Sequence, residues 1–241
     1  MSNCYEETFR TLHHECDPWG RMTPGAVLRR VQETSTQHCI TVGLTDEVYQ
    51  STGTVFLLAR ISLQINSMPC PGDMVRIVTC AYPPVRAQYH RVTSFYSADG
   101  SLYCEAYSYW VLVDVATRRI LRRPPEDFPF PFDTSPDPAR EHDTGFEKPA
   151  ETSVLAQREA TYSLCDKNGH INNASYADLV CDHLPLPRLQ PRPLRRIVLV
   201  YRTEIPLGAL FTLSGAAVGD DGFYIAAGID GLRHFEAFAE F

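Results

Sequence analysis

Residues 165–172 read CDKNGHIN, and residues 16–23 read CDPWGRMT in the same register without a gap. Each octet precedes a helix-like segment, so both indicate the same turn from a strand into a helix. Two further pairs of segments match in the same order, 61–65 with 197–201 and 99–107 with 230–238. The chain is therefore predicted to contain two copies of one structural unit.

The copies are separated by a segment of different composition. Residues 122–150 hold seven prolines and many charges but little apolar periodicity, which is typical of an extended connector. We therefore expect an N-terminal domain at 1–121, a proline-rich linker at 122–150 and a C-terminal domain at 151–241.

Each copy is predicted to be one helix followed by antiparallel strands. In the first copy Thr23 can cap a helix that begins at Pro24 and ends at Gly43. The second copy has a shorter helix, from Asn173 to about His183. Alternating, β-branched and aromatic runs predict the strands, near 54–66, 73–82, 87–97 and 102–114 in the first copy and near 195–205, 209–218, 222–229 and 232–241 in the second. A helix packed on one face of a curled sheet is an α+β arrangement. This order of elements predicts two tandem hot-dog folds, packed like a hot-dog dimer.

Composition excludes several classes of function. The formal net charge of -7 repels nucleic acid, and no basic stripe with interleaved aromatics offsets that repulsion. No run of about 18 apolar residues is present to span a membrane. The stretch from Met1 to Glu7 has neither the basic start nor the apolar run of a secretory signal. We expect a cytoplasmic protein without a membrane span.

The eight cysteines include no C-x-x-C pair, which argues against a zinc ribbon and a redox dithiol. Reduced, mostly buried thiols are expected instead. Adjacent residues such as His13 and His14 point in different directions and cannot chelate one ion together. The sequence predicts no metal site and no cofactor.

The two octets differ where chemistry is possible. Only the second copy offers an imidazole and a carboxamide, and residues two apart in an extended segment face the same way. Asp166, Asn168 and His170 are therefore expected to converge on one side of the turn. The same register puts Glu204 opposite Met68 of the first copy. We predict one active site, made of these four residues of the second copy.

Two of the neighbouring residues have counterparts in the copy without the histidine. Asp166 matches Asp17, so part of its role is expected to be holding the turn. Cys165 matches Cys16, which favours a buried packing thiol over a nucleophile.

These residues resemble the acyl-acyl carrier protein thioesterases, a family with plant and bacterial members that terminate fatty acid synthesis. Residues 166–176 are similar to the family signature D-x-N-x-H-x-N-N-x-x-Y, and residues 201–204 to its Y-R-x-E strand. Features of the first copy also resemble the opening helix of the family, namely Thr23-Pro24, Gln32-Glu33, His38 and Gly43. The resemblance covers nearly the whole chain.

The resemblance implies an enzyme that hydrolyses the thioester of fatty acyl-acyl carrier protein and releases free fatty acid. Glu204, helped by His170, would activate water, while Asn168, His170 and nearby helix amides would polarise the thioester carbonyl. Asp166 would orient Asn168 and His170. Plant members carry a cysteine directly after the strand glutamate, but this chain has Ile205, so a cysteine nucleophile there is excluded.

The first copy is expected to supply the acyl pocket, since it has the longer helix and an aliphatic strand but lacks the catalytic groups. The candidate lining residues are Val27, Val31, Phe56, Leu58 and Trp110. Acyl carrier protein is strongly acidic, so docking on this acidic chain needs a local positive patch. The candidate docking residues are Arg188, Arg192, Arg195 and Arg196, and a competing patch is Arg118, Arg119, Arg122 and Arg123.

Two alternative functions stay open, and an enoyl hydratase of the same fold ranks behind the thioesterases because its signature spaces Asp and His more widely and includes Asn-Pro, which is absent here. An acyl-coenzyme A thioesterase acts on the same reacting group and differs only in the carrier. A hot-dog module can also be a non-catalytic acyl-binding protein. A homodimer of the whole chain is compatible with the sequence.

Overall fold

The computed structural model describes residues 3–125, 128, 132–190 and 193–241. A 3-10 turn at His13–Glu15 precedes the long helix of the first half. The helices and strands of this half are β1 (Cys4–Arg10), α1 (Pro24–Thr41), α2 (Asp46–Thr52), β2 (Thr54–Ile65), β3 (Met74–Val85), β4 (Gln88–Tyr96) and β5 (Leu102–Asp114). The strand predictions for this half are confirmed to within about three residues, and α2 is an addition.

The second half repeats the order with a shorter helix. Its elements are β6 (Ser153–Glu159), α3 (Ser175–Cys181), α4 (Leu186–Leu189), β7 (Arg196–Tyr201), β8 (Leu210–Val218), β9 (Gly222–Ile229) and β10 (Leu232–Glu240). A 3-10 turn at Tyr162–Leu164 leads from β6 toward α3, and another at Pro138–Arg140 lies between the halves.

The two main helices begin and end for local reasons. The Thr23 side chain accepts the N–H of Ala26 at 3.1 Å, which caps α1. Gly43 follows α1 with a φ of +83°, a conformation that favours glycine. α3 ends at Cys181, two residues before the predicted end. The N–H of His183 bonds to the Val180 carbonyl at 3.0 Å, a tighter i to i+3 closure that terminates the helix.

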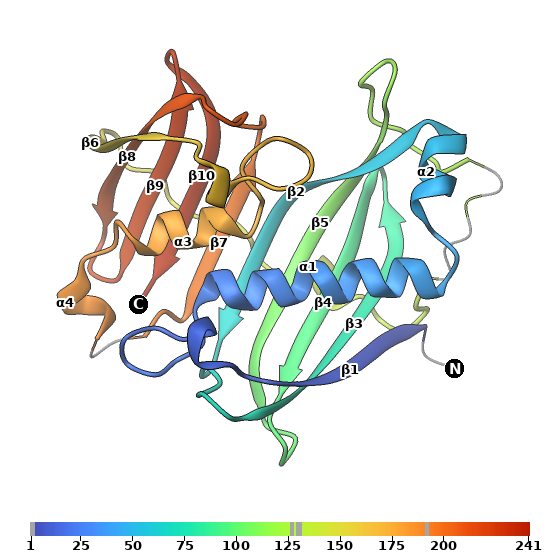
Figure 1. Ribbon diagram of the computed structural model, residues 1–241, viewed down its shortest axis with the longest axis horizontal. Helices are drawn as coiled ribbons and strands as arrows, with labels where there is room; N and C mark the ends of the chain where they lie inside the picture. Colours follow the sequence, from blue (N-terminus) through green and yellow to red (C-terminus); the bar gives the residue numbers. More distant parts are fainter. Residues whose placement is uncertain (1–2, 126–127, 129–131, 191–192) are drawn as a thin grey trace.

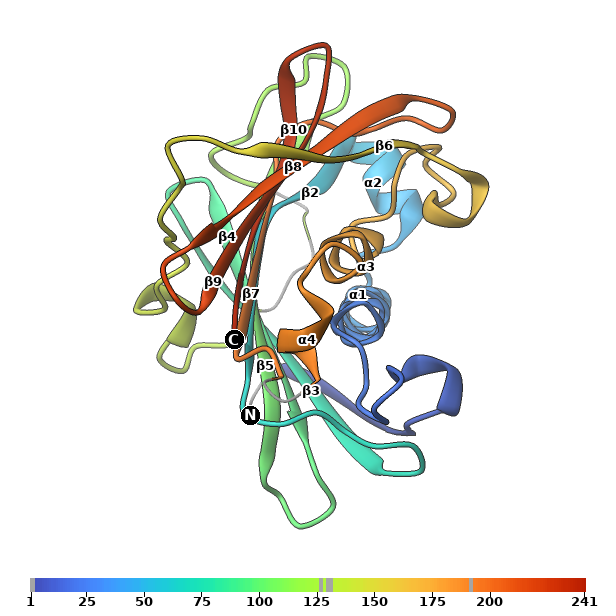
Figure 2. The same ribbon diagram turned by 90° about the vertical axis from the view of Figure 1, so that its left-hand side faces the viewer.

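All strands join one antiparallel sheet in the order β1-β3-β4-β5-β2-β7-β10-β9-β8-β6. The seam between the halves is the pairing of β2 with β7, from Arg60 opposite Val200 to Gln64 opposite Arg196. Figures 1 and 2 show α1 and α3 together on one face of this sheet. One apolar core runs beneath both helices, and residues of both halves contribute to it. The prediction of two hot-dog folds packed side by side is confirmed.

Residues 138–146 of the connection between the halves lie against the other face of the sheet (Figure 2). Ala139 is buried there against strands of the first half. The ring of Phe146 stacks on Phe238 of β10 at 5.7 Å between centroids. No helix in the described part of the chain is both long and apolar enough to cross a membrane.

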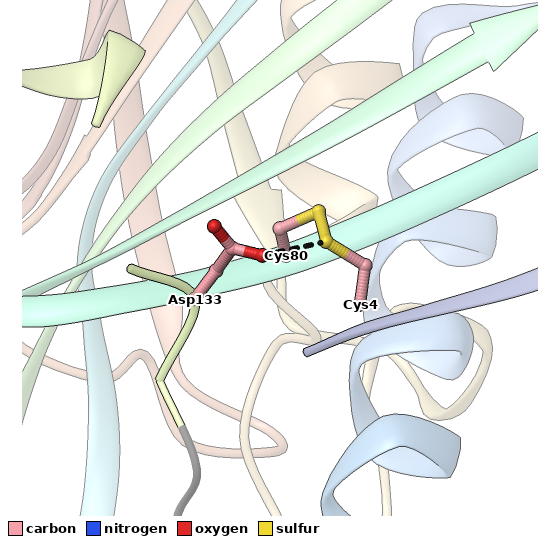
Figure 3. A group of neighbouring side chains, drawn as sticks. All are labelled: Cys4, Cys80 and Asp133. Atoms are coloured by element: carbon pink, nitrogen blue, oxygen red, sulfur yellow. Dashed lines mark hydrogen bonds between the residues drawn. A yellow bond between two sulfur atoms is a disulfide. The ribbon is translucent and has the colours of Figure 1, made fainter. Parts of the chain in front are cut away.

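A disulfide joins β1 to β3, which shows that the expectation of reduced thiols is wrong for Cys4 and Cys80. The two residues are direct partners in the strand ladder, with 4.4 Å between their Cα atoms, a separation at which a disulfide can form. They are 76 residues apart in sequence, so their spacing gave no sign of the pairing. Asp133 lies beside them, with its Oδ2 atom 3.5 Å from Cys4 Sγ (Figure 3).

Candidate active site

The turn that carries the predicted site is held by Asp166. Its Oδ1 atom accepts the N–H of Asn168 at 2.9 Å, and its own N–H bonds to the His170 carbonyl at 3.1 Å. Gly169 has a φ of +77°, which a residue with a side chain rarely adopts. These contacts fix the backbone on which Asn168 and His170 stand.

The first copy contains the same turn. Asp17 Oδ1 accepts the N–H of Trp19 at 2.9 Å, and the Asp17 N–H bonds to the Arg21 carbonyl at 2.7 Å. Gly20 also has a φ of +77°. The aspartate and the glycine therefore build the turn in both copies, while the side chains of residues 168 and 170 distinguish them.

Asn172 links the turn to the start of α3. Its side-chain amide donates to Asp166 Oδ2 at 3.0 Å, and its Oδ1 atom accepts the N–H of Ala174 at 2.8 Å. The N–H of Ser175 bonds to the Asn172 carbonyl at 2.9 Å. These two amides of the helix start are thus already bonded within the chain.

His170 and Glu204 lie on one face of a short two-stranded ribbon. The N–H of Ile171 bonds to the Ile205 carbonyl at 2.9 Å, and His170 lies opposite Pro206. Since side chains alternate along extended chain, His170, Glu204 and Pro206 share a face. Ile171 and Ile205 point the other way into the core, where they are 1% and 0% exposed. Diagonal partners of this kind stand about 7 Å apart, which leaves room for a water or a carbonyl between them.

The corresponding ribbon of the first copy confirms the predicted register. The N–H of Met22 bonds to the Pro69 carbonyl at 2.8 Å, as that of Ile171 does to Ile205. Met68 therefore occupies the position of Glu204. The carboxylate and the imidazole both belong to the second copy.

The side chains of the candidate active site are accessible. Asn168 and Glu204 are exposed, and His170 is half-buried. The Nδ1 atom of His170 lies 3.2 Å from the Ile171 carbonyl, so a proton on Nδ1 donates this bond and leaves the Nε2 lone pair as an acceptor. Among the described residues, the side chains of Asn168, His170 and Glu204 make no direct hydrogen bond with one another.

Two tyrosines that were not predicted as site residues lie next to the ribbon, Tyr176 and Tyr201. Tyr176 is 3% exposed and stacks on Phe235 at 4.3 Å between centroids. Burial, and to a smaller extent the nearby Glu204 charge, raises the pKa of Tyr176. The Tyr201 hydroxyl donates to the Asn173 carbonyl at 2.9 Å. Both tyrosines lie within the motifs that carry the family resemblance, and this was the available signal.

Cys165 is not placed as a nucleophile. Burial raises the pKa of its thiol, and the adjacent Asp166 charge raises it further. A reactive cysteine needs the opposite, because the thiolate is the attacking form. The prediction of a packing thiol agrees with this environment.

The candidate pocket residues fall into three groups. Val27 and Val31 of α1 are 0% and 3% exposed within the common core. Leu58 and Trp110 are partly buried and lie directly opposite each other on β2 and β5. Phe56 packs edge-on against Tyr89 at 4.9 Å between centroids. The structure thus brings Leu58 and Trp110 together and sets Phe56 in a separate aromatic cluster.

The candidate docking arginines are largely engaged within the chain. Arg195 pairs with Asp221 at 3.5 Å and donates to the Phe241 carbonyl at 2.6 Å. Arg196 pairs with Glu240 at 3.3 Å. The guanidinium of Arg188 lies 5.7 Å from the centre of the Phe241 ring, and Arg192 lies outside the described residues. The competing arginines, Arg118, Arg119, Arg122 and Arg123, are all exposed.

Two family models match this chain. The model for the acyl-ACP thioesterase N-terminal domain matches residues 2–128, and that for the C-terminal domain matches residues 147–223. A chloroplastic palmitoyl-acyl carrier protein thioesterase of Gossypium hirsutum is 25% identical over 191 residues, which cover 74% of this chain and 46% of that protein. Oleoyl-acyl carrier protein thioesterase 2 of Arabidopsis thaliana is 26% identical over 220 residues, which cover 83% and 59%. The chain spans about half the length of the curated relatives it matches.

Solved structures share the fold at lower identity. An acyl-ACP thioesterase from Bacteroides thetaiotaomicron superposes with a TM-score of 0.84 at 20% identity, covering 99% of this chain and 97% of that one. A 12:0-ACP thioesterase from Umbellularia californica superposes with a TM-score of 0.85 at 18% identity, covering 100% and 97%. These similarities establish that the whole chain has the architecture of those proteins.

Proposed function

Since the chain belongs to the acyl-ACP thioesterase family, we propose that it hydrolyses the thioester of fatty acyl-acyl carrier protein and releases the fatty acid. The observation that carries this proposal is the shared face of His170 and Glu204, with Asn168 at the adjoining turn. The equivalent positions of the first copy hold Arg21, Met68 and Trp19. One chain then has one active site, although the fold is repeated.

The reaction needs a base, a carbonyl donor and water. In the proposed mechanism a water molecule attacks the thioester carbonyl carbon. Glu204 removes a proton from this water, assisted by the Nε2 atom of His170. The side-chain amide of Asn168 donates to the developing oxyanion. When the carbon-sulfur bond breaks, the proton passes to the departing sulfur, which leaves as the thiol of the carrier. Asp166 is a positioning residue, because its carboxylate holds the Asn168 backbone and the Asn172 side chain.

The test is a substrate panel with purified protein. Acyl-acyl carrier proteins of several chain lengths and the matching acyl-coenzymes A are compared by following free thiol and fatty acid. We expect hydrolysis of both, with kcat/KM higher for the carrier protein. A preference for coenzyme A would support the acyl-coenzyme A alternative, and binding of acyl groups without thiol release would support the non-catalytic one.

The location and assembly of the protein are also predictions. We infer a cytoplasmic protein from the sequence, and fractionation of the source cells tests this. The Cys4–Cys80 disulfide would be open to reduction in a reducing cytoplasm and would persist in an oxidising compartment, so alkylation of free thiols before lysis reports the compartment. A homodimer is tested by light scattering.

A further inference from the structure

A wide groove lies on the face of the sheet opposite the helices, partly covered by the connection between the halves. Its volume is about 780 Å³. The polar side chains that line it include Arg60, His90, Arg140, His142 and Arg202. The groove is therefore basic, in a chain whose formal net charge is -7.

The charge of Arg60 is less neutralised by nearby carboxylates than the charges of Arg140 and Arg202. Its Nη1 atom donates to Thr144 Oγ1 at 2.7 Å and to the Thr144 carbonyl at 3.4 Å. Across the described part of the chain no carboxylate forms an ion pair with Arg60. Its positive charge is therefore available to a ligand.

The other cations of the groove share their acids. Arg140 lies 3.5 Å from Asp137, but Asp137 also holds the ring of buried His90 at 2.6 Å. Arg202 Nε donates to Glu236 at 2.7 Å. Asp137 and Glu236 thus each interact with more than one basic group.

Glu236 is surrounded by three cations. Lys148 Nζ lies 2.7 Å and Arg233 Nη1 3.0 Å from its Oε1 atom, in addition to the Arg202 bond. Two cations therefore remain in excess around this one acid. Two further acids, Asp143 and Glu105, act on the nearby His142, and the cations around the groove still outnumber the acids.

The groove lies beside the end of β7, from which the chain leads to Glu204. Arg60 and Val200 form the last pair of the seam between β2 and β7, and Tyr201 and Arg202 line the groove just beyond it. Arg202 precedes Glu204 by two residues, so their Cα atoms are at most about 7 Å apart. The hydroxyl of Tyr201 reaches the Asn173 carbonyl beside the catalytic turn. A partner seated in the groove is within reach of the catalytic ribbon.

We propose that this groove is where acyl carrier protein docks, with its acidic surface against Arg60, Arg140 and Arg202. The inference rests on the proposed function, because that function supplies an acidic partner. Long-range attraction by the groove would raise the association rate of an anionic partner despite the negative net charge of the chain. Arg195 and Arg196 are ion-paired elsewhere and offer less free charge.

The test reverses charge in the groove and compares it with two matched surfaces. The groove variant is Arg60→Glu with Arg140→Glu, which spares Arg202 because that residue supports buried Glu236. The control variants are Arg118→Glu with Arg119→Glu, and Arg188→Glu with Arg195→Glu. All three change the net charge by the same amount, so a general effect of charge would appear in all of them.

Binding and turnover are measured separately. Binding uses the anisotropy of fluorescently labelled acyl carrier protein, and turnover uses acyl-acyl carrier protein and the neutral S-acyl pantetheine. We expect the groove variant to weaken carrier binding and lower kcat/KM for the carrier substrate by about tenfold or more at low salt. The loss should shrink at higher salt, because surface charges are screened over about 10 Å at 0.1 M. Turnover of S-acyl pantetheine should change less than about twofold.

Several outcomes overturn the proposal. It fails if either control variant loses as much carrier binding as the groove variant, or if the groove variant binds the carrier normally. It also fails if both substrates lose turnover equally. If the unaltered protein hydrolyses no thioester, the proposed function fails, while the anisotropy measurement still decides the docking surface. If the double variant does not fold, Arg60→Gln alone should show a smaller loss in the same direction, and an unchanged affinity for that variant would count against the groove.

Discussion

His170 and Glu204, the proposed catalytic pair, lie on a ribbon whose other face is apolar core. This geometry explains why the residue after the glutamate is not a catalytic group here. Ile205 is fully buried and points away from His170. Even a cysteine at position 205 would face the core, where burial raises the pKa of a thiol and suppresses its reactivity.

Substitutions in the ribbon should therefore affect turnover and leave folding unchanged. We expect His170→Ala, Asn168→Ala and Glu204→Gln each to lower kcat about a hundredfold or more, because each removes a proton carrier or a carbonyl donor. The control is Cys165→Ser, which should retain turnover within a few-fold. Steady-state kinetics measures the loss of kcat, and thermal unfolding checks that each variant is folded. Near-normal kcat in Glu204→Gln would remove that residue from the mechanism.

Glu236 is expected to make the folding stability of the protein depend on pH in the acidic range. Burial alone would raise its pKa, but hydrogen bonds from Lys148, Tyr224 and Arg202 and the Arg202 charge lower it to about 2. The ordinary pKa of this carboxyl group is 4.5. Because folding lowers the pKa, the ionised group stabilises the folded protein at pH values above 4.5. This stabilisation is lost as the pH drops from 4.5 toward 2.

The variant Glu236→Gln isolates this contribution. At neutral pH it should be less stable than the unaltered protein by about 1–3 kcal/mol, because buried partners lose a charged acceptor. Urea unfolding at a series of pH values should show the difference shrinking below about pH 4.5. A difference that stays constant down to pH 2 would assign the effect to packing and not to ionisation.

At the scale of elements, α1 and α3 approach most closely where a glycine faces an aspartate. A Cβ atom at Gly25 would lie 1.9 Å from Asp178 Oδ1. The carboxylate of Asp178 also pairs with Arg29 of α1. The sequence predicted both helices from capping and periodicity, but not this contact. Residues 25 and 178 belong to different copies, and the repeat does not say how the copies face each other.

A double-mutant cycle measures this contact. Gly25→Ala should destabilise the unaltered protein, since Asp178 must move and its bond to Arg29 is disturbed. In an Asp178→Ala background the same substitution should be neutral or stabilising by up to about 1 kcal/mol, because alanine favours helix over glycine. Urea unfolding of the four proteins gives the coupling. Equal effects in both backgrounds would show that the helices do not meet at this point.

At the scale of the whole molecule, the two halves differ in what they contribute. The second half holds the candidate catalytic ribbon, and the first holds the longer helix and the longest strands (Figure 1). The repeat and the hydrophobic pattern were enough to predict this architecture and the register of Glu204 against Met68. They could not predict the interior of the first half. There Arg91 Nη1 lies 2.9 Å from His38 Nδ1 and 3.1 Å from Thr79 Oγ1, a polar cluster of residues from α1, β4 and β3.

This difference between the halves predicts how chain length is selected. Leu58 and Trp110 lie opposite each other just beyond the last seam pair, Arg60 with Val200, and they are only partly buried. If the first half supplies the acyl pocket, as proposed from the sequence, this pair is expected to lie on the route of the acyl chain. Leu58→Trp should therefore shift the product profile toward shorter fatty acids by a few carbons, and Trp110→Ala toward longer ones. Gas chromatography of the products from a mixed acyl-acyl carrier protein panel measures the shift.

The core residues serve as the control for this prediction. Val31 is 3% exposed within the common core, so Val31→Phe should lower stability by about 1–3 kcal/mol through overpacking before it changes specificity. Leu58→Trp should instead keep its unfolding midpoint and change its products, because a half-buried position has room for the larger ring. If both Leu58→Trp and Trp110→Ala released the same fatty acids as the unaltered protein, the acyl chain would have to run elsewhere.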